Sequence, residues 1–235
     1  MVTLPNLADQ WQATLGWQPT VAHQEQWQSL YDMLLDANQH LNLTRITTPE
    51  DFWEKHLWDS LRGVKDDLTR PAGLRLLDVG SGAGFPGLPL AIARPDWAVT
   101  LLEARRKKTV FLESVIQQLA LPNAQPVTAR AEALAQQPRQ RGAYDRVLVR
   151  AVGSAVDCAR YAWPFVKPGG EVVLYRGQWT ETEADQLAAV IQTWGQAVLK
   201  VEAFETPLTA GRRHRVVVQR LLPGNQPGAF PAKSR

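Results

Sequence analysis

A glycine-rich stretch decides the fold class: Asp78-Val79-Gly80-Ser81-Gly82-Ala83-Gly84-Phe85-Pro86-Gly87. An apolar run over 74–79 precedes it and a helical pattern follows it, so the stretch lies where a strand turns into a helix. Glycines allow a tight turn and a close approach of a ligand to the backbone, and the first N–H groups of the next helix face that ligand. The stretch therefore predicts the ligand-binding turn of an α/β fold.

After this turn, short apolar runs alternate with helical patterns, which is typical of βαβ units and a parallel sheet. We expect strands near 74–79, 98–103, 124–129, 144–150 and 170–176, and helices near 87–94, 105–120, 153–163 and 180–194. No helical pattern separates the last two apolar runs, near 197–204 and 213–221, which should form an antiparallel hairpin that closes the sheet. The expected fold is a doubly wound α/β sheet whose last strand is antiparallel.

The N-terminal part of the chain has a helical pattern instead. Apolar residues recur at helical spacing from Trp27 to Leu35. A second helix should begin after the capping residue Thr48, with Pro49 in its first turn, and continue to Leu61. We therefore divide the chain into a helical cap over 1–70, an α/β domain over 71–222 and a flexible tail over 223–235.

Composition restricts the setting of the protein. The chain of 235 residues can bury a sizeable core, and its single cysteine, Cys158, excludes a disulfide framework and favours a reducing cytoplasm. The N-terminus lacks the pattern of a secretory signal, and no apolar run is long enough to span a bilayer. We expect a soluble cytoplasmic protein with no membrane partner, and no spacing of residues suggests a metal site.

The net charge of +3 says little about partners, but its distribution is uneven. Residues 1–73 carry five Lys/Arg and ten Asp/Glu, whereas residues 204–235 carry six and one. Two basic clusters, Arg105-Arg106-Lys107-Lys108 and Arg212-Arg213-His214-Arg215, could bind phosphates of RNA. Each could also be an ordinary solvated face of the protein.

The glycine-rich turn and the acid after the next strand suggest a nucleoside-containing cofactor. Glu103 ends that strand, 25 residues after Asp78, where a carboxylate could accept both hydroxyls of an adenosine ribose. Gly82-x-Gly84-x-x-Gly87 also matches a dinucleotide fingerprint, so NAD must be considered. In that fingerprint the first glycine follows the strand directly. Here the glycine that follows the strand is Gly80, not Gly82, and this register favours S-adenosylmethionine. A plain tight turn with a strand-end acid is the remaining alternative.

Further motifs, spread over roughly residues 25–220, narrow the class. They are Leu41-Asn42-Leu43-Thr44, His56-Leu57-Trp58-Asp59-Ser60, the extension of the glycine-rich stretch through Leu88-Pro89-Leu90, Arg130-Ala131-Glu132 and Arg150-Ala151. The glycines alone indicate a class I methyltransferase, but Gly84-Phe85-Pro86-Gly87-Leu88-Pro89 together with Arg150-Ala151 is more specific. The set resembles the bacterial small-subunit ribosomal RNA methyltransferase G family, also called glucose-inhibited division protein B.

This resemblance implies a class I, Rossmann-like methyltransferase fold and transfer of a methyl group from S-adenosylmethionine to N7 of a guanosine. That guanosine lies in the decoding-region hairpin of 16S rRNA, and the partner would be this rRNA or the 30S subunit. The resemblance places Gly80 and Phe85 in the cofactor pocket, Ala131-Glu132 beside the adenine, and Arg150 at the catalytic mouth. With the turn and strand-end acid, the expected cofactor-binding residues are Asp78, Gly80, Gly82, Gly84, Phe85, Glu103, Ala131, Glu132 and Arg150.

The implied chemistry requires little acid–base machinery, because guanine N7 already carries an in-plane lone pair. Orientation can then supply most of the catalysis. Arg150 could read guanine O6 or hold a phosphate through two parallel hydrogen bonds, or could simply pair with a nearby acid. The family commonly has a lysine before the glycine that follows the fifth strand, where this chain has Arg176 before Gly177. Arginine keeps the positive charge, so we expect Arg176 to contact RNA, but its planar guanidinium does not replace lysine in a role that needs an ammonium group.

Two other interpretations stay open on the residues alone. One is a class I methyltransferase for a small molecule or a protein, and the other is a catalytically silent RNA- or nucleotide-binding module. Of the nine tryptophans, five fall before residue 60, and we expect them to pack the cap rather than stack on bases. We likewise expect His56 to be a buried, hydrogen-bonded histidine rather than a catalyst.

Overall fold

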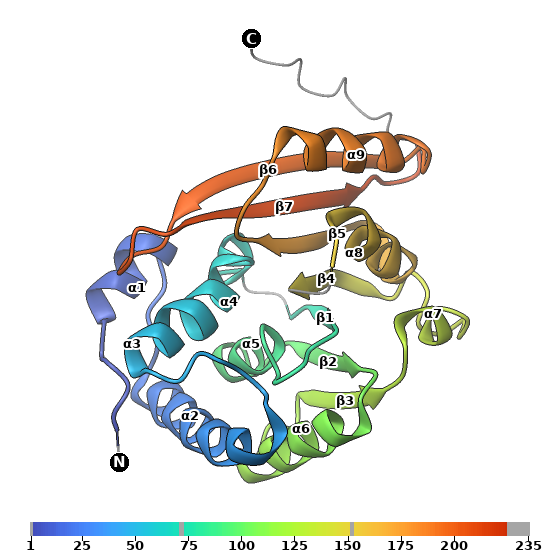
Figure 1. The fold of residues 1–235 in the computed structure, drawn as a ribbon. Coiled ribbons are helices and arrows are strands. Elements are labelled where there is room, and N and C mark those ends of the chain that lie inside the picture. Colours follow the sequence, from blue (N-terminus) through green and yellow to red (C-terminus); the bar gives the residue numbers. More distant parts are fainter. Residues whose placement is uncertain (1, 71–72, 151–152, 225–235) are drawn as a thin grey trace.

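The computed structural model describes residues 2–70, 73–150 and 153–224. Within them, a seven-stranded sheet has the strand order β3-β2-β1-β4-β5-β7-β6 (Figure 1). Strands β1 to β5 run parallel, while β7 is antiparallel to both β5 and β6. The strands are β1 (Arg75–Val79), β2 (Ala98–Glu103), β3 (Ala124–Thr128), β4 (Tyr144–Arg150), β5 (Val166–Arg176), β6 (Ala197–Glu205) and β7 (Arg212–Arg220).

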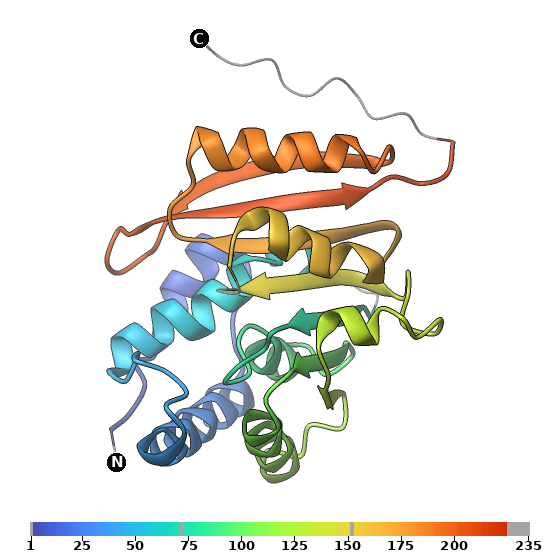
Figure 2. The same cartoon turned by 45° about the vertical axis from the view of Figure 1, so that its right-hand side comes forward.

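Helices cover both faces of this sheet. On one face lie α5 (Gly87–Ala93) and α6 (Arg106–Gln118); on the other lie α8 (Ala155–Ala162) and α9 (Glu181–Gln192), as the turned view in Figure 2 shows. The short helix α7 (Ala131–Leu134) follows β3, and one 3₁₀ turn (Trp163–Phe165) precedes β5. This is the expected doubly wound α/β fold with an antiparallel last strand.

The N-terminal cap packs over α5 and α6. It contains α1 (Ala8–Leu15), α2 (Val21–Leu41), α3 (Pro49–Phe52), a π-helical segment (Trp53–Trp58), α4 (Asp59–Arg62) and a 3₁₀ turn (Lys65–Asp67). Its apolar side chains join the same core cluster as one face of the sheet. The cap is therefore helical, as expected, and its core is continuous with that of the α/β domain.

Local signals explain where the cap helices begin and end. The Thr20 side chain accepts a hydrogen bond from the His23 backbone at the start of α2, and Asn42 ends that helix in the left-handed conformation. The expected apolar stripe of α2 is buried except at its end, where Leu35 is partly buried. The second expected helix begins after Thr48, but it is not a regular α-helix, which corrects the prediction.

The difference is the π-helical segment Trp53–Trp58, in which the Asp59 N–H bonds to the Glu54 carbonyl. The extra residue per turn lets five side chains of the segment be buried at once, namely Trp53, Glu54, His56, Leu57 and Trp58. Such segments are frequent at functional sites. Periodicity alone did not reveal it, because six residues are too few for the spacing of apolar residues to distinguish a π-turn from an α-helix.

Other differences are small. Strand β5 begins at Val166, earlier than expected, and the four-residue α7 was too short to give a helical pattern. Residues 225–235 of the expected tail lie outside the described residues. None of the helices in the described part of the chain is both long and apolar enough to cross a bilayer.

Candidate cofactor site and catalytic cleft

The glycine-rich turn lies at the carboxyl end of β1, beside the point where the strand order reverses between β1 and β4. Parallel α/β sheets bind ligands at this position. The turn is held against β2, because the N–H groups of Gly80 and Ser81 both donate to the Leu102 carbonyl, at 2.8 and 3.0 Å. Gly82 has a φ of 59°, and a Cβ on Gly84 would lie 2.2 Å from the Leu88 side chain. The turn therefore requires glycine at both positions.

Asp78, the last acid before the turn, is buried beneath it. One carboxylate oxygen, Oδ2, accepts a hydrogen bond from the Gly87 N–H at 2.8 Å. The other, Oδ1, is buried and has no hydrogen-bond partner among the residues that the structure describes. Burial raises the pKa of Asp78 to about 7. Such an oxygen would be satisfied by a donor from a bound ligand, which makes the turn a fitting cofactor site.

Glu103 ends β2 and links the turn to the next helix. Its Oε2 accepts from the Gly82 N–H at 3.0 Å and its Oε1 from the Arg105 N–H at 2.8 Å. Each oxygen keeps a second lone pair, so acceptance of ribose hydroxyls stays a prediction compatible with this geometry. Lys108 belongs to the same neighbourhood, since a Cβ on Gly82 would lie 3.8 Å from its Nζ.

The residues expected beside the adenine lie one strand further out. In the β2–β3 register Glu103 is opposite Thr128, and the Ala129 N–H bonds to the Glu103 carbonyl at 3.2 Å. Ala131 and Glu132 begin α7 directly afterwards, with Glu132 exposed. They are thus next to the strand end that carries Glu103, and their adenine contact stays a prediction.

Arg150 ends β4 and is held by the cap. Its Nη1 donates to the Lys55 carbonyl at 2.7 Å, and its Nη2 lies 2.9 Å from Nδ1 of His56. Asp59 adds an ion pair at 3.6 Å. The guanidinium also lies 5.5 Å from the Phe85 ring centre. Arg150 is therefore held in one orientation by the cap, and its contact with a guanine or a phosphate stays a prediction. Its motif partner Ala151 lies outside the described residues.

His56 is the functional residue whose role the sequence pattern understated. Burial, together with the Arg150 charge, holds its pKa well below the usual value, so the ring is neutral. Because arginine only donates, we assign Nδ1 as the acceptor and Nε2–H as the donor to Thr44 Oγ1, 3.0 Å away. The ring stacks on Phe85 at 4.1 Å between centroids. His56 is buried and hydrogen-bonded, as expected, but it also positions Arg150.

A cleft of about 410 Å³ opens beside this cluster. Its walls come from the cap, from the ends of β4 and β5 and from the start of β7: Ile46, Lys55, His56, Asp59, Arg150, Tyr175, Arg176, Gly177 and Arg213. Four of these side chains are cations and one is an acid. Burial raises the pKa of Asp59, although Arg150 and Arg213 oppose the shift. The cleft is suited to a polyanion.

The basic residues expected to bind RNA are divided by the structure. Arg176 lines the cleft but is tied to Glu183 at 2.5 Å and to the Gly153 carbonyl. Arg213 lines the cleft, and Arg212 is exposed beside it. Arg215, in contrast, does not line the cleft: it donates to the Gly63 carbonyl and pairs with Asp66 at 3.1 Å.

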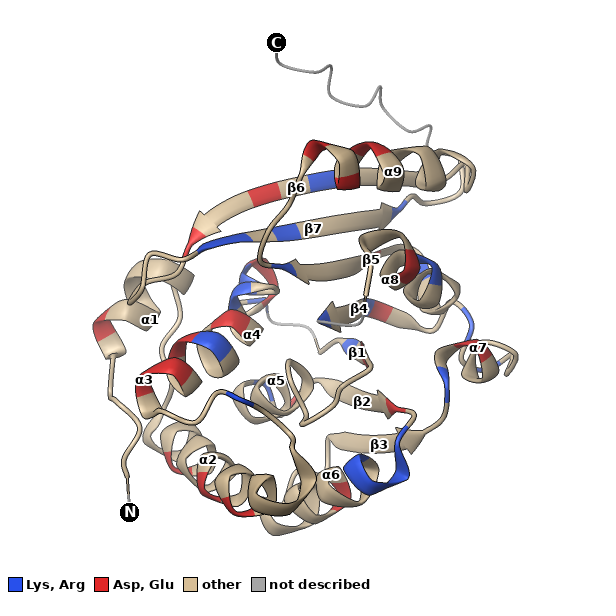
Figure 3. Cartoon of the chain, viewed as in Figure 1, with Lys and Arg blue, Asp and Glu red and all other residues tan. Residues whose placement is uncertain are grey.

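The first basic cluster lies at the carboxyl end of β2. Arg105, Arg106 and Lys107 are exposed at the start of α6, where Figure 3 shows the concentration of Lys and Arg. Arg106 pairs with Glu113 at 2.6 Å, while Lys108 leans toward the glycine-rich turn. Because β2 and β5 are parallel, their carboxyl ends lie on the same side of the sheet. The cluster and the cleft therefore both lie at the carboxyl ends of the strands.

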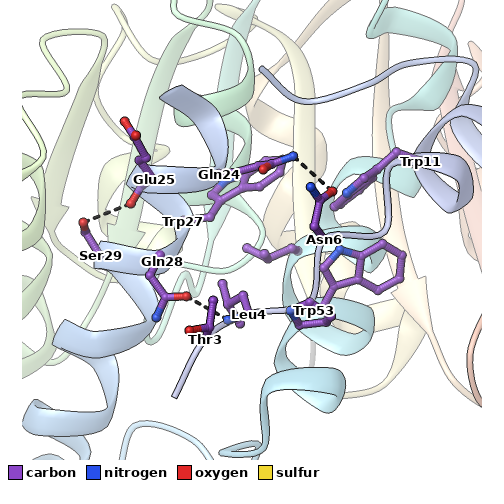
Figure 4. Close-up of a pocket in the computed structure, with 12 residues that line it drawn as sticks. Thr3, Leu4, Asn6, Trp11, Gln24, Glu25, Trp27, Gln28, Ser29 and Trp53 are labelled. Atoms are coloured by element: carbon purple, nitrogen blue, oxygen red, sulfur yellow. Dashed lines mark hydrogen bonds between the residues drawn. The ribbon is translucent and has the colours of Figure 1, made fainter. Parts of the chain in front are cut away.

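The cap tryptophans form a core, as expected. Trp11, Trp27, Trp53 and Trp58 are almost completely buried, and Trp11 contacts Trp27 and Trp53 at 5.3 and 4.8 Å between ring centres. Three of them also line a cavity of about 460 Å³ beneath the N-terminal segment (Figure 4). That cavity is separated from the cleft by the π-helical segment, so these rings are not placed to stack on a base at the cleft.

Within the described ranges 2–70, 73–150 and 153–224, no group of His, Cys, Asp and Glu side chains is arranged to hold a metal ion.

Comparison with known proteins agrees with this geometry. The model of the GidB family, described as rRNA small subunit methyltransferase G, matches residues 23–216. The ribosomal RNA small subunit methyltransferase G of Nostoc punctiforme is 46% identical over 97% of this chain and 94% of that protein. The Gloeobacter violaceus protein of the same name is 50% identical over 91% of this chain and 84% of that protein.

A solved structure agrees in fold alone. That of M. jannaschii TYW2 in complex with AdoMet has a TM-score of 0.52 at 18% identity, covering 68% of this chain and 74% of that one. The family match begins in α2 of the cap and includes the rest of the cap, the glycine-rich turn, Arg150 and the first half of β7. The chain therefore belongs to the rRNA small subunit methyltransferase G family.

Proposed function

We propose that this chain transfers the methyl group of S-adenosylmethionine to N7 of a guanosine in the decoding-region hairpin of 16S rRNA. The observation that carries the proposal is the convergence of four distant motifs. Thr44, His56, Phe85 and Arg150 come from the cap, the glycine-rich turn and β4, and they meet beside a cationic cleft. Family membership supplies the reaction class and the class of RNA.

The residues of the turn fit this cofactor. The unpartnered Asp78 Oδ1 suits a cationic N–H donor, which the amino group of the methionine moiety offers. Glu103, at the end of β2, suits the ribose hydroxyls, and Ala131-Glu132 would flank the adenine. Bound here, the cofactor supplies an electrophilic methyl group on a sulfonium.

The protein's part in the reaction is orientation. Guanine N7 needs no deprotonation, so no general base is required, and correct alignment of reactants can contribute on the order of 7–11 kcal/mol. Phe85 and His56 form a rigid stacked pair at the mouth, and His56 with Lys55 holds Arg150. Arg150 then donates to guanine O6 or to a phosphate, which positions the base.

The charge of the cleft supports a nucleic-acid substrate over a small neutral one. The cleft is lined by four cations, Lys55, Arg150, Arg176 and Arg213, and by a single acid, Asp59. Two further acids, Asp51 and Glu183, pair with Lys55 and Arg176. Exposed Arg105, Arg106 and Lys107 extend the positive charge along the same edge of the sheet. We propose that the substrate is rRNA, presented in the cytoplasm by the 30S subunit, because basic residues lie both in the cleft and at the start of α6.

The test is incubation of the protein with radiolabelled S-adenosylmethionine and either unmodified 30S subunits or naked 16S rRNA, followed by mapping of the methylated base. We expect incorporation at guanine N7 of one nucleotide, with 30S subunits as the better substrate. Incorporation elsewhere, or labelling only of a small molecule or protein, would contradict the proposal.

A further inference from the structure

The loop between β6 and β7 closes around a carboxylate from the cap. Glu54, in the π-helical segment, is almost completely buried. Its Oε1 accepts hydrogen bonds from the backbone N–H groups of Leu208 and Thr209, at 2.6 and 2.9 Å. Its Oε2 accepts from the Thr209 hydroxyl at 2.6 Å. Three hydrogen bonds thus join the cap to a loop that is more than half the chain length away in sequence.

This carboxylate is held in its charged form. Burial alone would raise the pKa of Glu54, but the hydrogen bonds from Thr209 and Leu208 outweigh it and lower the pKa below the usual value. Successive backbone N–H groups that converge on one oxygen form an anion-binding turn. Here the anion is a side chain of the same protein, so the loop has a fixed docking point on the cap.

The hydrogen bonds continue from this docking point to the basic residues of β7. Thr209 Oγ1 lies 3.0 Å from Thr206 Oγ1, which accepts from the Gly211 N–H at 2.9 Å. The Thr206 N–H returns a bond to the Gly211 carbonyl at 3.0 Å. Gly211 immediately precedes Arg212 and Arg213. A hydrogen-bond chain that begins at Glu54 therefore holds the loop that leads directly into both arginines.

The same π-helical segment also holds the opposite wall of the cleft. The carbonyl of Lys55 and the ring of His56 position Arg150, and both residues follow Glu54 directly. One turn of backbone thus contacts Arg150 directly and, through Glu54, the loop that leads to Arg213. Both guanidinium groups line the cleft.

We infer that Glu54 is a positioning residue for RNA binding, which sets Arg212 and Arg213 at the correct distance from Arg150. The inference rests on the proposed function, because it concerns how the rRNA is gripped. Glu54 itself is buried and is placed to act only through the loop that it holds.

The hairpin has other attachments to the cap, so loss of Glu54 should loosen the loop without unfolding the protein. Phe204 packs on Trp58 with 5.8 Å between ring centres, and the Arg62 guanidinium lies 4.2 Å from the Phe204 ring. Arg62 also pairs with Glu202 at 2.6 Å. These contacts anchor β6 independently of the loop.

The experiment compares wild type with Glu54→Ala, Glu54→Gln and a control, Leu199→Ala. Glutamine keeps the oxygen that accepts both backbone N–H groups, so this variant should retain most of the function. Leu199 is a partly buried residue of β6 distant from the loop, so its truncation destabilises the hairpin without touching the bonds to Glu54. Thermal melts show which variants are folded at the assay temperature.

We expect Glu54→Ala to raise KM for 30S subunits, and Kd for a 16S rRNA hairpin, about tenfold, since misplaced binding groups cost this much or more. Affinity for S-adenosylhomocysteine, measured by calorimetry, should be unchanged. The log–log salt slope of hairpin binding should become shallower by roughly 0.7 for each phosphate that the misplaced arginines no longer neutralise. Glu54→Gln should shift KM and Kd much less, and Leu199→Ala should lower the melting temperature without moving the salt slope.

An unchanged Kd and salt slope in Glu54→Ala, or an equal change in Leu199→Ala, would overturn the inference. If Glu54→Ala does not fold, Thr209→Val removes the hydroxyl bonds to Glu54 and Thr206 and keeps both backbone N–H bonds to Glu54. An unaltered RNA affinity in that variant would overturn the inference as well. Absence of methylation by wild type, with RNA binding still sensitive to Glu54, would instead contradict the proposed function.

Discussion

Arg150 donates from Nη2 to Nδ1 of His56 across 2.9 Å, and this bond joins two residues 94 positions apart. The histidine is kept neutral by burial and by the arginine itself. It can therefore accept from Arg150 on one side and donate to Thr44 on the other. A protonated ring could not make the first of these bonds, so the arrangement depends on pH.

The first prediction concerns that pH dependence. Because the folded-state pKa of His56 lies below its unfolded value of 6.5, the unfolded chain binds a proton that the folded chain excludes, and stability should fall as pH drops below about 6.5. We expect His56→Gln to be less stable than wild type at pH 8 but to lose less stability between pH 7 and pH 5. Urea unfolding at several pH values measures this. Parallel pH curves for the two proteins would contradict it.

Asp78 should make cofactor affinity rise with pH. Its pKa of about 7 in the folded protein means that part of the population is protonated near neutrality. A cationic donor from the cofactor would bind only the carboxylate, so affinity for S-adenosylmethionine should increase as pH rises from 6 to 8, with release of a proton. The stability of the unliganded protein should change with pH in the opposite direction to cofactor affinity. Because its pKa is raised, Asp78 contributes most to stability below pH ~4, and this contribution is lost as the pH rises through about 7.

Calorimetry in buffers of different ionisation enthalpy measures both affinity and proton release. Asp78→Asn should bind the cofactor more weakly and without the pH trend. A pH-independent wild type would show that Asp78 does not contact the cofactor amino group.

The glycine-rich turn should accept S-adenosylmethionine and S-adenosylhomocysteine but not NAD. Gly82→Val should lower affinity for S-adenosylmethionine and S-adenosylhomocysteine at least tenfold. The reason is that a left-handed φ of 59° costs an L-residue about 1–2 kcal/mol, and a β-branched residue such as valine more. Gly142→Ala, at a left-handed glycine away from the turn, controls for backbone strain alone. Tight NAD binding, or normal cofactor affinity in Gly82→Val, would refute the assignment.

Arg150→Ala should lower methyl transfer at least about tenfold and weaken cofactor binding much less, since a bidentate guanine contact contributes about 1–3 kcal/mol. Arg150→Lys should recover only part of the rate, because a single ammonium cannot reproduce the contacts to Lys55 and His56 together. Single-turnover assays with 30S subunits separate this effect from product release. Wild-type rates in Arg150→Ala would leave Arg150 as a structural ion-pair partner of Asp59.

The basic residues should differ in their effect on the salt dependence of RNA binding. Four phosphate contacts on single-stranded RNA would give a slope of about −3 in a plot of the logarithm of the binding constant against the logarithm of the salt concentration. Charge reversal of Arg212 and Arg213 should make this slope shallower without changing cofactor affinity. Reversal of Arg215 should chiefly reduce stability, because its guanidinium bonds to Gly63 and Asp66. Reversal of exposed Arg160 on α8 is the control, and identical slopes in all variants would show that the β7 arginines are only solvated.

The amino-acid sequence by itself determined the α/β fold, the glycine-rich turn and the final hairpin. These features depend on residues within about one strand and one helix of each other, so periodicity and glycine positions report them directly. The same local patterns placed Asp78 and Glu103 at the carboxyl ends of two strands. Because these strands are parallel neighbours in the sheet, the two acids lie close together. Family motifs also marked His56 and Arg150, but not the contact between them.

Only the tertiary structure decided how the cap meets the sheet. The π-helical segment turns Glu54 toward the β6–β7 loop and His56 toward Arg150, although both belong to one short stretch of chain. The end of the cap likewise holds Arg215, through Gly63 and Asp66, while Arg213, two residues earlier, lines the cleft. Such outcomes depend on packing between segments that are far apart in the chain. This packing determines which partner each charged side chain can reach. A linear pattern of residue types does not contain that information.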